Sequence, residues 1–221
     1  MLPWDRVEVL RDQGVFFANH SHGHPHTGDM LKGETPARYE ERLSRDTLRA
    51  RDLLRSHGID NDWYAYPYGE WTPRFEGALL SLGYRMLFSQ NPGVASPGGN
   101  VGTPVPRMAI VGGEVALDDF KRQLSRLPLH AELLQPSPGW TEGTITGIEI
   151  SIPGLASWGT GEVNLFVSEK GRLDPAVDVG GGIIRLDGPI ILDRTLNRII
   201  VSARDRATGN YRLKSWLLLK P

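Results

Sequence analysis

The stretch Val15-Phe-Phe-Ala-Asn-His-Ser-His-Gly-His-Pro-His26 decides how the rest of the chain is interpreted. It places four of the six histidines of the 221-residue chain directly after an apolar segment. A strand that ends in imidazoles predicts a site for a divalent metal, because neutral imidazole is the commonest protein ligand for zinc, nickel and cobalt. Gly23 and Pro25 favour a tight loop over a helix, so His20 and His24 can meet at one point. The alternative is a histidine-rich surface loop that binds metal only adventitiously.

The composition is that of an ordinary globular protein, with 39% hydrophobic and 23% charged residues. A net charge of -1 gives no electrostatic reason to expect nucleic acid or an anionic membrane as a partner. The chain has no cysteine, so histidine and carboxylate must supply any metal ligands. No apolar run approaches the roughly 20 residues that span a bilayer.

The first 131 residues alternate helical and strand patterns, which predicts an α/β fold with a parallel sheet or barrel. Thr35-Pro36 and Thr72-Pro73 have the form of an N-cap followed by proline at the first helical position. We expect helices at roughly 4–13, 36–57, 73–82 and 117–127, and strands at 14–19, 63–66, 84–88 and 108–111.

The pattern changes after Gln135-Pro-Ser-Pro-Gly139. Short segments with period-two alternation follow, such as Ile145–Ile152, and turn residues separate them. Six or seven short strands at this spacing predict a β-sandwich. We therefore expect two domains, residues 1–131 and 139–221, joined by a linker at 132–138.

A second motif, Tyr64-Ala-Tyr-Pro-Tyr-Gly69, ends the strand that follows the long helix. The order of strand, His-Ser-x-x-His-Pro, helix, strand and Tyr-Pro-Tyr-Gly resembles the polysaccharide deacetylases of the NodB-homology group, carbohydrate esterase family 4. The resemblance covers roughly residues 3–130 and is greatest to deacetylases of poly-N-acetylglucosamine and related exopolysaccharides. It implies a partial NodB-like (β/α) barrel followed by the all-β sandwich.

The resemblance also implies a site and a reaction. His20 and His24 would hold a divalent metal, with zinc expected and nickel or cobalt as alternatives, and Tyr68 would give its backbone amide to an oxyanion hole. His22 and His26 would be exposed or lie beside the ligands. The residues that would line the substrate groove are Tyr66, Pro67 and Trp71. The substrate would be an N- or O-acetylated polysaccharide, and the protein would be secreted or periplasmic.

Some family features have no match. The family's Asp-Asp motif, which supplies the base and the third metal ligand, should precede the histidine motif; Asp118-Asp119 instead begins a predicted helix, where aspartate is ordinary at the N-terminus. Ala65 stands where an arginine often orients the base, and His130 ends a helix where the family's acid histidine follows a strand. We therefore expect a longer natural protein, with weak metal binding and no activity for this chain alone. An open sheet edge would then favour pairing with a second copy.

Two other classes of function remain open. An amidohydrolase-like metal hydrolase would use His20-Ser-His22 or His22-Gly-His24, but it needs further histidines, and only His57 and His130 are left. A non-catalytic carbohydrate-binding protein would use tryptophans of the sandwich, namely Trp140, Trp158 and Trp216. Tryptophans exposed in line would support this function, and buried ones would leave the sandwich as a spacer.

Overall fold

The structure is a computed structural model and describes residues 2–96 and 104–220. These residues form two compact units, which are considered one at a time. The first unit holds residues 2–89 and 104–105, and the second holds residues 90–96 and 106–220. The chain is mixed α/β with several sheets, which confirms the predicted fold class at that level.

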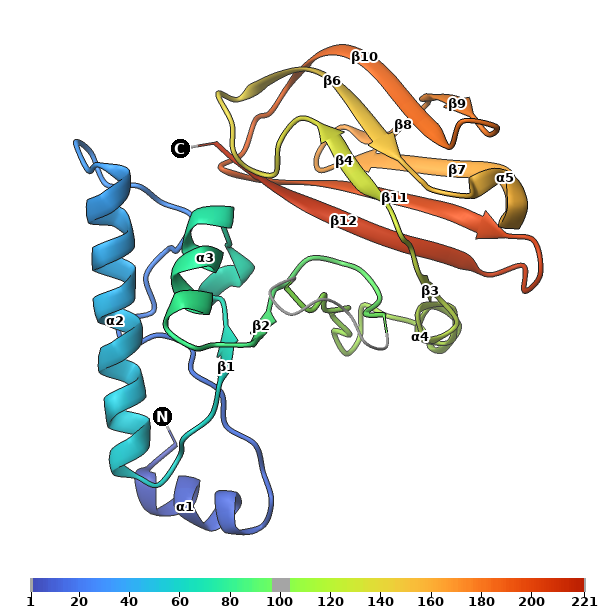
Figure 1. Cartoon of the computed structure of the whole chain (residues 1–221). Coiled ribbons are helices and arrows are strands. Elements are labelled where there is room, and N and C mark those ends of the chain that lie inside the picture. Colours follow the sequence, from blue (N-terminus) through green and yellow to red (C-terminus); the bar gives the residue numbers. More distant parts are fainter. Residues whose placement is uncertain (1, 97–103, 221) are drawn as a thin grey trace. The chain divides into compact units, whose positions relative to one another are not determined.

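The first unit is a small parallel sheet with helices against it. Its elements are α1 (Trp4–Asp12), α2 (Pro36–Ser56), β1 (Trp63–Ala65), the 3-10 helix η1 (Pro67–Gly69), α3 (Pro73–Ser81) and β2 (Met86–Phe88). β1 and β2 pair in parallel with Tyr64 opposite Leu87, and Asn19 joins the other side of β1 through a parallel bridge to Tyr64. Figure 1 shows α2 and α3 side by side next to this sheet. The expected strand at 14–19 is thus reduced to the bridge at Asn19.

The long helix α2 begins where its sequence predicts. Thr35 Oγ1 accepts a hydrogen bond from the Arg38 amide at 3.3 Å, with Pro36 in the first turn. Its buried face recurs every three or four residues, as an amphipathic helix requires. The residues on that face are Tyr39, Leu43, Thr47 and Ala50. α3 begins in the same way, because Thr72 Oγ1 accepts from the Phe75 amide at 3.1 Å.

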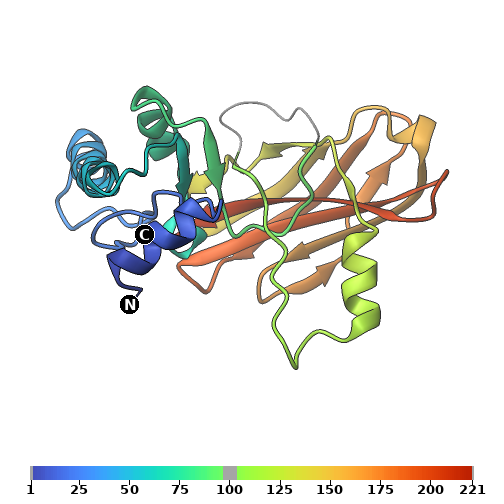
Figure 2. The ribbon, with the colours of Figure 1, turned by 90° about the horizontal axis from the view of Figure 1, so that it is seen from below.

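The second unit consists mainly of strands in two sheets that share one core (Figures 1 and 2). Its elements are α4 (Leu117–Leu124), β3 (Leu127–Pro128), β4 (Glu132–Gln135), β5 (Gly139–Trp140), β6 (Thr144–Ser151), α5 (Leu155–Trp158), β7 (Gly159–Val167), β8 (Gly171–Leu173), β9 (Ala176–Asp178), β10 (Ile183–Ile191), β11 (Leu196–Asp205) and β12 (Tyr211–Leu219). In the described residues one sheet has the order β4-β6-β10-β9 and the other has the order β3-β12-β11-β7-β8, with β5 also on β12. Ile150 and Ile184 from the first sheet and Ile199 and Leu218 from the second are fully buried between them.

Two sequence predictions differ from the structure around residues 106–131. Met108–Val111 forms no strand, and Ile110 and Val111 are each 48% exposed. The segment before the expected linker also belongs to the second unit, because Leu129 and Ala131 lie in the core that the two sheets share. The division between the units therefore falls earlier in the chain than residues 132–138. No helix within the described ranges is long and apolar enough to cross a membrane.

Candidate functional site

The histidine loop follows the bridge at Asn19, and it brings two imidazoles together. His20 Nδ1 lies 2.8 Å from the backbone oxygen of Ala65, at the end of β1. A carbonyl oxygen only accepts, so Nδ1 of His20 carries the proton and Nε2 presents its lone pair. The Nε2 atom of His24 lies 3.1 Å from the Nε2 atom of His20. Both nitrogens therefore point to the same small volume.

This separation suits one shared metal ion. Two nitrogens that each bind zinc at about 2.0–2.1 Å, at angles between a right angle and a tetrahedral one, lie about 2.8–3.4 Å apart. The hydrogen bond from Nδ1 to a backbone carbonyl is the usual support of a metal-binding histidine, because it fixes the tautomer and the ring orientation. No group of three or more possible ligands occurs within residues 2–96 and 104–220. His20 and His24 thus fit as two ligands of a divalent ion, and the described residues supply no third.

The loop is shaped by a carboxylate from α2. Asp46 accepts hydrogen bonds from the amides of His22 at 2.8 Å and Gly23 at 2.9 Å. A Cβ atom at position 23 would lie 3.0 Å from Asp46 Oδ1, so the close approach of the loop to the carboxylate favours glycine there. Within the loop, Ser21 Oγ accepts from the His24 amide at 2.9 Å. Asp46 therefore turns the chain between the two candidate ligands.

Asn19 anchors the start of the loop in the core. Its side chain is buried, and its Nδ2 donates to the Thr47 carbonyl at 3.0 Å and to the Tyr84 hydroxyl at 2.6 Å. Its Oδ1 accepts from the amide of Ser21 at 2.9 Å. All of these contacts fix the residue that immediately precedes His20.

The second motif places Tyr68 against the loop. Its ring stands edge-on to that of His24, with ring centres 4.6 Å apart, and its backbone has a φ of +56°. The Tyr68 amide donates to no other residue in the described part of the chain. A free backbone N–H beside a metal-binding pair is suited to stabilise an oxyanion. Tyr68 is 42% exposed, so this side of the motif is open to solvent.

The predicted groove residues differ in exposure. Tyr66 is 1% exposed and packs its ring edge against Tyr64 and Phe75, so its side chain belongs to the core. Pro67 is also buried, beneath the turn that carries Tyr68. Trp71 is half-buried, and its Nε1 is buried with no hydrogen-bond partner among the described residues.

A carboxylate–histidine pair adjoins the candidate ligands. His26 Nδ1 lies 2.9 Å from Oε1 of Glu70, and this hydrogen bond raises the pKa of the His26 imidazole. The His26 ring lies flat on that of Tyr68, with centres 4.0 Å apart and planes 5° from parallel. Neither Asp46 nor Glu70 was singled out as a site residue from the sequence. The position of Glu70 directly after Tyr66-Pro-Tyr-Gly69 was the available signal, whereas Asp46 lies in mid-helix and gave none.

The other histidines serve elsewhere in the structure. His57 follows the end of α2, where its ring stacks on Trp4 with centres 3.9 Å apart and its Nδ1 lies 2.9 Å from Glu8 Oε1. His130 is exposed and belongs to the second unit. Neither forms part of a metal-binding group, so the histidines that an amidohydrolase-like site requires are not brought together in the described residues.

The acidic pair at the start of α4 and the tryptophans of the second unit also have local roles. Asp118 and Asp119 pair with Lys121 and Arg122 within the helix, as side chains three residues apart do. Trp216 is buried in the core, and Trp158 packs against the same core beneath the Arg212 guanidinium. Trp140 is half-buried. These three tryptophans do not form an exposed row.

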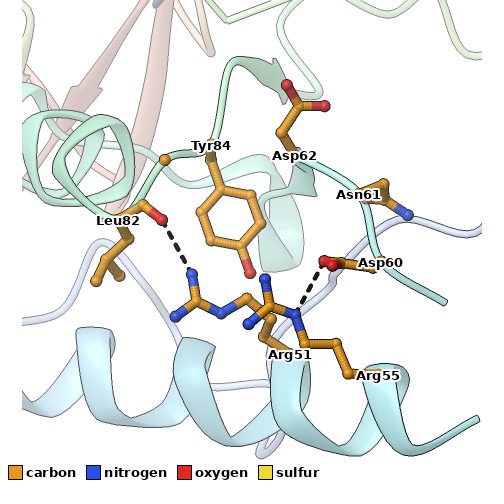
Figure 3. A pocket seen from close by; sticks show the side chains of 8 residues that line it. Arg51, Arg55, Asp60, Asn61, Asp62, Leu82 and Tyr84 are labelled. Carbon is orange, nitrogen blue, oxygen red and sulfur yellow. Dashed lines mark hydrogen bonds and ion pairs between the residues drawn. The ribbon is translucent and has the colours of Figure 1, made fainter. Parts of the chain in front are cut away.

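A cavity of about 380 Å³ lies beside the residues that precede β1. Figure 3 shows Arg51 and Arg55 reaching it from α2, where Arg51 donates to the Leu82 carbonyl at 3.0 Å and Arg55 to Asp60 at 2.9 Å. Its lining includes none of the candidate ligands or residues of the Tyr-Pro-Tyr-Gly motif. This cavity is therefore separate from the candidate site.

Comparison with known proteins matches the first part of the chain to one family. The sequence model of the polysaccharide deacetylase family matches residues 3–87, which include the histidine loop and the Tyr-Pro-Tyr-Gly motif. The resemblance stated from the two motifs is thereby confirmed over residues 3–87, which make up less than half of the chain.

Several solved deacetylases have similarity to the chain. The deacetylase domain of BpsB from Bordetella bronchiseptica is 20% identical, with a TM-score of 0.44 and 48% of each chain covered. IcaB from Ammonifex degensii is 22% identical, with a TM-score of 0.38 and 51% of this chain and 49% of that one covered. A de-N-acetylase from Aggregatibacter actinomycetemcomitans is 17% identical, with a TM-score of 0.47, and the match covers 56% of this chain and 53% of that one. The chain thus spans about half the length of these structures. No curated protein matches it.

Proposed function

We propose that this chain carries part of the active site of a metal-dependent deacetylase that acts on N- or O-acetylated polysaccharide. The observation that carries the proposal is the 3.1 Å approach of His20 Nε2 to His24 Nε2, with His20 oriented by the Ala65 carbonyl. The first unit would then be a partial NodB-like (β/α) barrel and the second a β-sandwich.

Each site residue would have a separate role in the proposed reaction. A divalent ion, with zinc expected and nickel or cobalt as alternatives, would polarise the acetyl carbonyl and lower the pKa of a bound water. His20 and His24 would hold that ion, and the hydrogen bond to Ala65 would keep Nε2 of His20 unprotonated. The Tyr68 amide would donate to the oxygen on which negative charge develops. These roles account for the free amide and for the orientation of both rings.

The substrate class follows from the same proposal. A groove beside Tyr68 and Trp71 would take a polymer related to poly-N-acetylglucosamine, and such a protein would work outside the cytoplasm, secreted or in the periplasm. Self-association through a sheet edge stays a prediction. With two protein ligands among the described residues, we expect zinc to bind weakly and this chain alone to release no acetate.

Zinc titration by calorimetry tests the metal site. We expect the wild-type chain to bind one zinc ion, and His20→Ala and His24→Ala each to abolish that binding, because each removes one of only two ligands. His22→Ala is the matched control, since His22 belongs to the same loop but is exposed and contributes only its backbone amide to Asp46. Retention of zinc binding in either ligand variant would overturn the assignment.

Titration with an N-acetylglucosamine oligomer tests the substrate. If the oligomer binds at the candidate site, the backbone chemical shifts measured by nuclear magnetic resonance should change at Tyr68 and in the histidine loop. Shifts confined to the second unit would instead support the non-catalytic carbohydrate-binding alternative.

A further inference from the structure

Glu70 is a buried carboxylate that ties the two site motifs together. It is 5% exposed, and no lysine or arginine within the described ranges pairs with it. Its Oε1 lies 2.9 Å from His26 Nδ1, its Oε2 accepts from the Gly28 amide at 3.1 Å, and its backbone oxygen accepts from the Thr27 hydroxyl. Glu70 directly follows the Tyr-Pro-Tyr-Gly motif. It therefore makes three contacts with residues 26–28, at the end of the histidine loop.

These contacts continue toward the candidate metal ligands through stacked rings. The ring of His26, fixed by Glu70, lies flat on the ring of Tyr68 at 4.0 Å. Tyr68 in turn presents an edge to His24, with ring centres 4.6 Å apart. Aromatic rings prefer such parallel and edge-on arrangements over other orientations. Glu70, His26, Tyr68 and His24 thus form one continuous series, which we call the ring stack.

The two candidate ligands are oriented in different ways. His20 is held directly, by the hydrogen bond from its Nδ1 to the Ala65 carbonyl. The Nδ1 of His24 makes no hydrogen bond to a described residue. Its orientation depends on the backbone turn, on the contact of its Nε2 with His20 Nε2 at 3.1 Å and, on the other side of the ring, on the contact with Tyr68. A metal-binding histidine is usually oriented by a hydrogen bond to its second nitrogen, so His24 needs a substitute.

We propose that Glu70 is a positioning residue that sets the ring of His24 through His26 and Tyr68, and so prepares it to bind a divalent metal. The inference rests on the proposed function. It adds a role for the residue that follows the Tyr-Pro-Tyr-Gly motif and for His26, which would make no contact with the metal. A merely structural role of Glu70 would stabilise the fold without affecting His24 in particular.

Three substitutions separate the two roles. Glu70→Ala removes both side-chain contacts. Glu70→Gln keeps them, because its amide oxygen can accept from the Gly28 amide while its NH₂ donates to His26 Nδ1. Glu34→Ala is the matched control: the Glu34 side chain is also largely covered, it is bound to Arg42 at 2.7 Å and to the Leu31 amide at 2.9 Å, and in the described part of the chain it has no hydrogen bond or ion pair with a member of the ring stack.

The first readout needs no metal. Histidine side-chain nitrogen and proton shifts, measured by nuclear magnetic resonance on the metal-free chain, should change at His24 in Glu70→Ala and stay as in the wild type in Glu70→Gln and Glu34→Ala. Unchanged His24 shifts in folded Glu70→Ala would overturn the proposal. If Glu70→Ala does not fold, Tyr68→Leu is used in its place. It removes the ring between His26 and His24 and leaves Glu70 unchanged, and the His24 side-chain shifts are again expected to change. Its absence in that variant would equally refute the role.

The second readout is zinc affinity by calorimetry on the full chain. Glu70→Ala should bind zinc about 10-fold more weakly. Loss of a residue that hydrogen-bonds a metal ligand weakens binding by about 10- to 100-fold, and we expect the lower value because Glu70 acts through two intervening rings. Glu70→Gln and Glu34→Ala should stay within about 3-fold of the wild type. An equal loss in Glu34→Ala and Glu70→Ala would mean that both act only through stability, and would overturn the proposal. Failure of the wild type to bind zinc would refute the proposed function, whereas the His24 shifts decide the positioning role by themselves.

Discussion

Glu76 predicts an unusual dependence of stability on pH in the first unit. It lies in the first turn of α3, and its Oε2 is buried with no hydrogen-bond partner among the described residues. Burial raises the pKa of the Glu76 carboxyl from its ordinary 4.5 to about 7. Between these values the folded state holds a proton that the unfolded chain has released. Stability therefore falls as pH rises from about 4.5 through about 7, the reverse of the usual carboxylate.

Competing effects set the size of the change. A rise of the pKa from 4.5 to about 7 corresponds to an upper limit of about 3 kcal/mol. Because Glu76 is only partly buried, solvent screening reduces this to about 1–2 kcal/mol. The positive end of the α3 dipole favours the charged carboxylate by about 0.3–1 kcal/mol, which is smaller than the penalty of burial. We therefore expect Glu76→Gln to stabilise the first unit by about 1–2 kcal/mol at pH 8 and to have little effect at pH 5.

Urea unfolding at pH 5, 6, 7 and 8, followed by ellipticity at 222 nm, measures this difference, since the long helix α2 and the helix α3 both lie in the first unit. The pKa of His26 is also raised by Glu70 from its ordinary 6.5, so stability from that pair is lost as pH rises above about 6.5, at the upper end of this range. Comparison of the wild type with Glu76→Gln removes this contribution, because both proteins contain it. Glu41→Gln is the control, as Glu41 is exposed and pairs with Arg45 on the surface of α2. Equal pH dependence in the wild type and Glu76→Gln would refute the reasoning.

Three further predictions concern the support of the site. Asn19→Ala should destabilise the first unit by about 2–4 kcal/mol in urea, because it removes three hydrogen bonds, two of them buried and one part-buried; a loss below about 1 kcal/mol would contradict the anchoring role. Thr72→Ala should lower stability by about 1–2 kcal/mol, since Thr72 caps α3 and also meets the Tyr39 hydroxyl at 3.0 Å, whereas Thr35→Ala at an exposed cap should lower it by only about 0.5 kcal/mol. Equal losses would mean that the buried contact adds nothing. Zinc at ten times its dissociation constant should stabilise the chain by about 1.4 kcal/mol, reversibly with a chelator, and an equal effect on His20→Ala would place the metal elsewhere.

Local signals in the sequence were sufficient for the helices of the first unit. Thr35-Pro36 and Thr72-Pro73 each combine a capping hydroxyl with a proline at the first helical position. Proline is tolerated there because a backbone N–H at this position would have no acceptor within the helix, and both helices begin at these residues. The apolar period of α2 likewise fixed which face is buried. Predictions from these features are correct because the features depend only on residues within one or two helical turns.

Predictions that needed packing partners were less reliable. The composition of the apolar segment at 108–111 predicts a strand, yet no strand within residues 2–96 and 104–220 pairs with it, and Ile110 and Val111 are exposed. Leu117 and Leu124 in α4 are exposed for the same reason, although the helix itself forms where its period predicts. Whether an apolar face is covered depends on elements distant in sequence, which a single-sequence pattern does not contain.

The site shows the same division. His20 and His24 can be found by type and spacing, but the contacts that orient them come from a backbone oxygen at Ala65, a mid-helix Asp46 and the carboxylate of Glu70. The Ala65 carbonyl and Asp46 have no local signature, since a backbone carbonyl is present at every position and acidic residues are common on helices, and Glu70 is marked only by its position after the Tyr-Pro-Tyr-Gly motif. The two candidate ligands can thus be proposed from sequence and stay a prediction, whereas the residues that contact them are found only from the fold.

Backbone strain ties these points to the chemistry. In the described part of the chain, the non-glycine residues with positive φ are Ser21, His24, Tyr68 and Glu169, so three of the four lie in the candidate site. Such a conformation costs a residue with a side chain about 1–2 kcal/mol, and glycine would avoid that cost. Glycine at position 24 would remove the imidazole, and glycine at position 68 would remove the ring that contacts it. His24 and Tyr68 each need a positive φ for a tight turn and a ring for the proposed site. The strained backbone is therefore retained at these two residues.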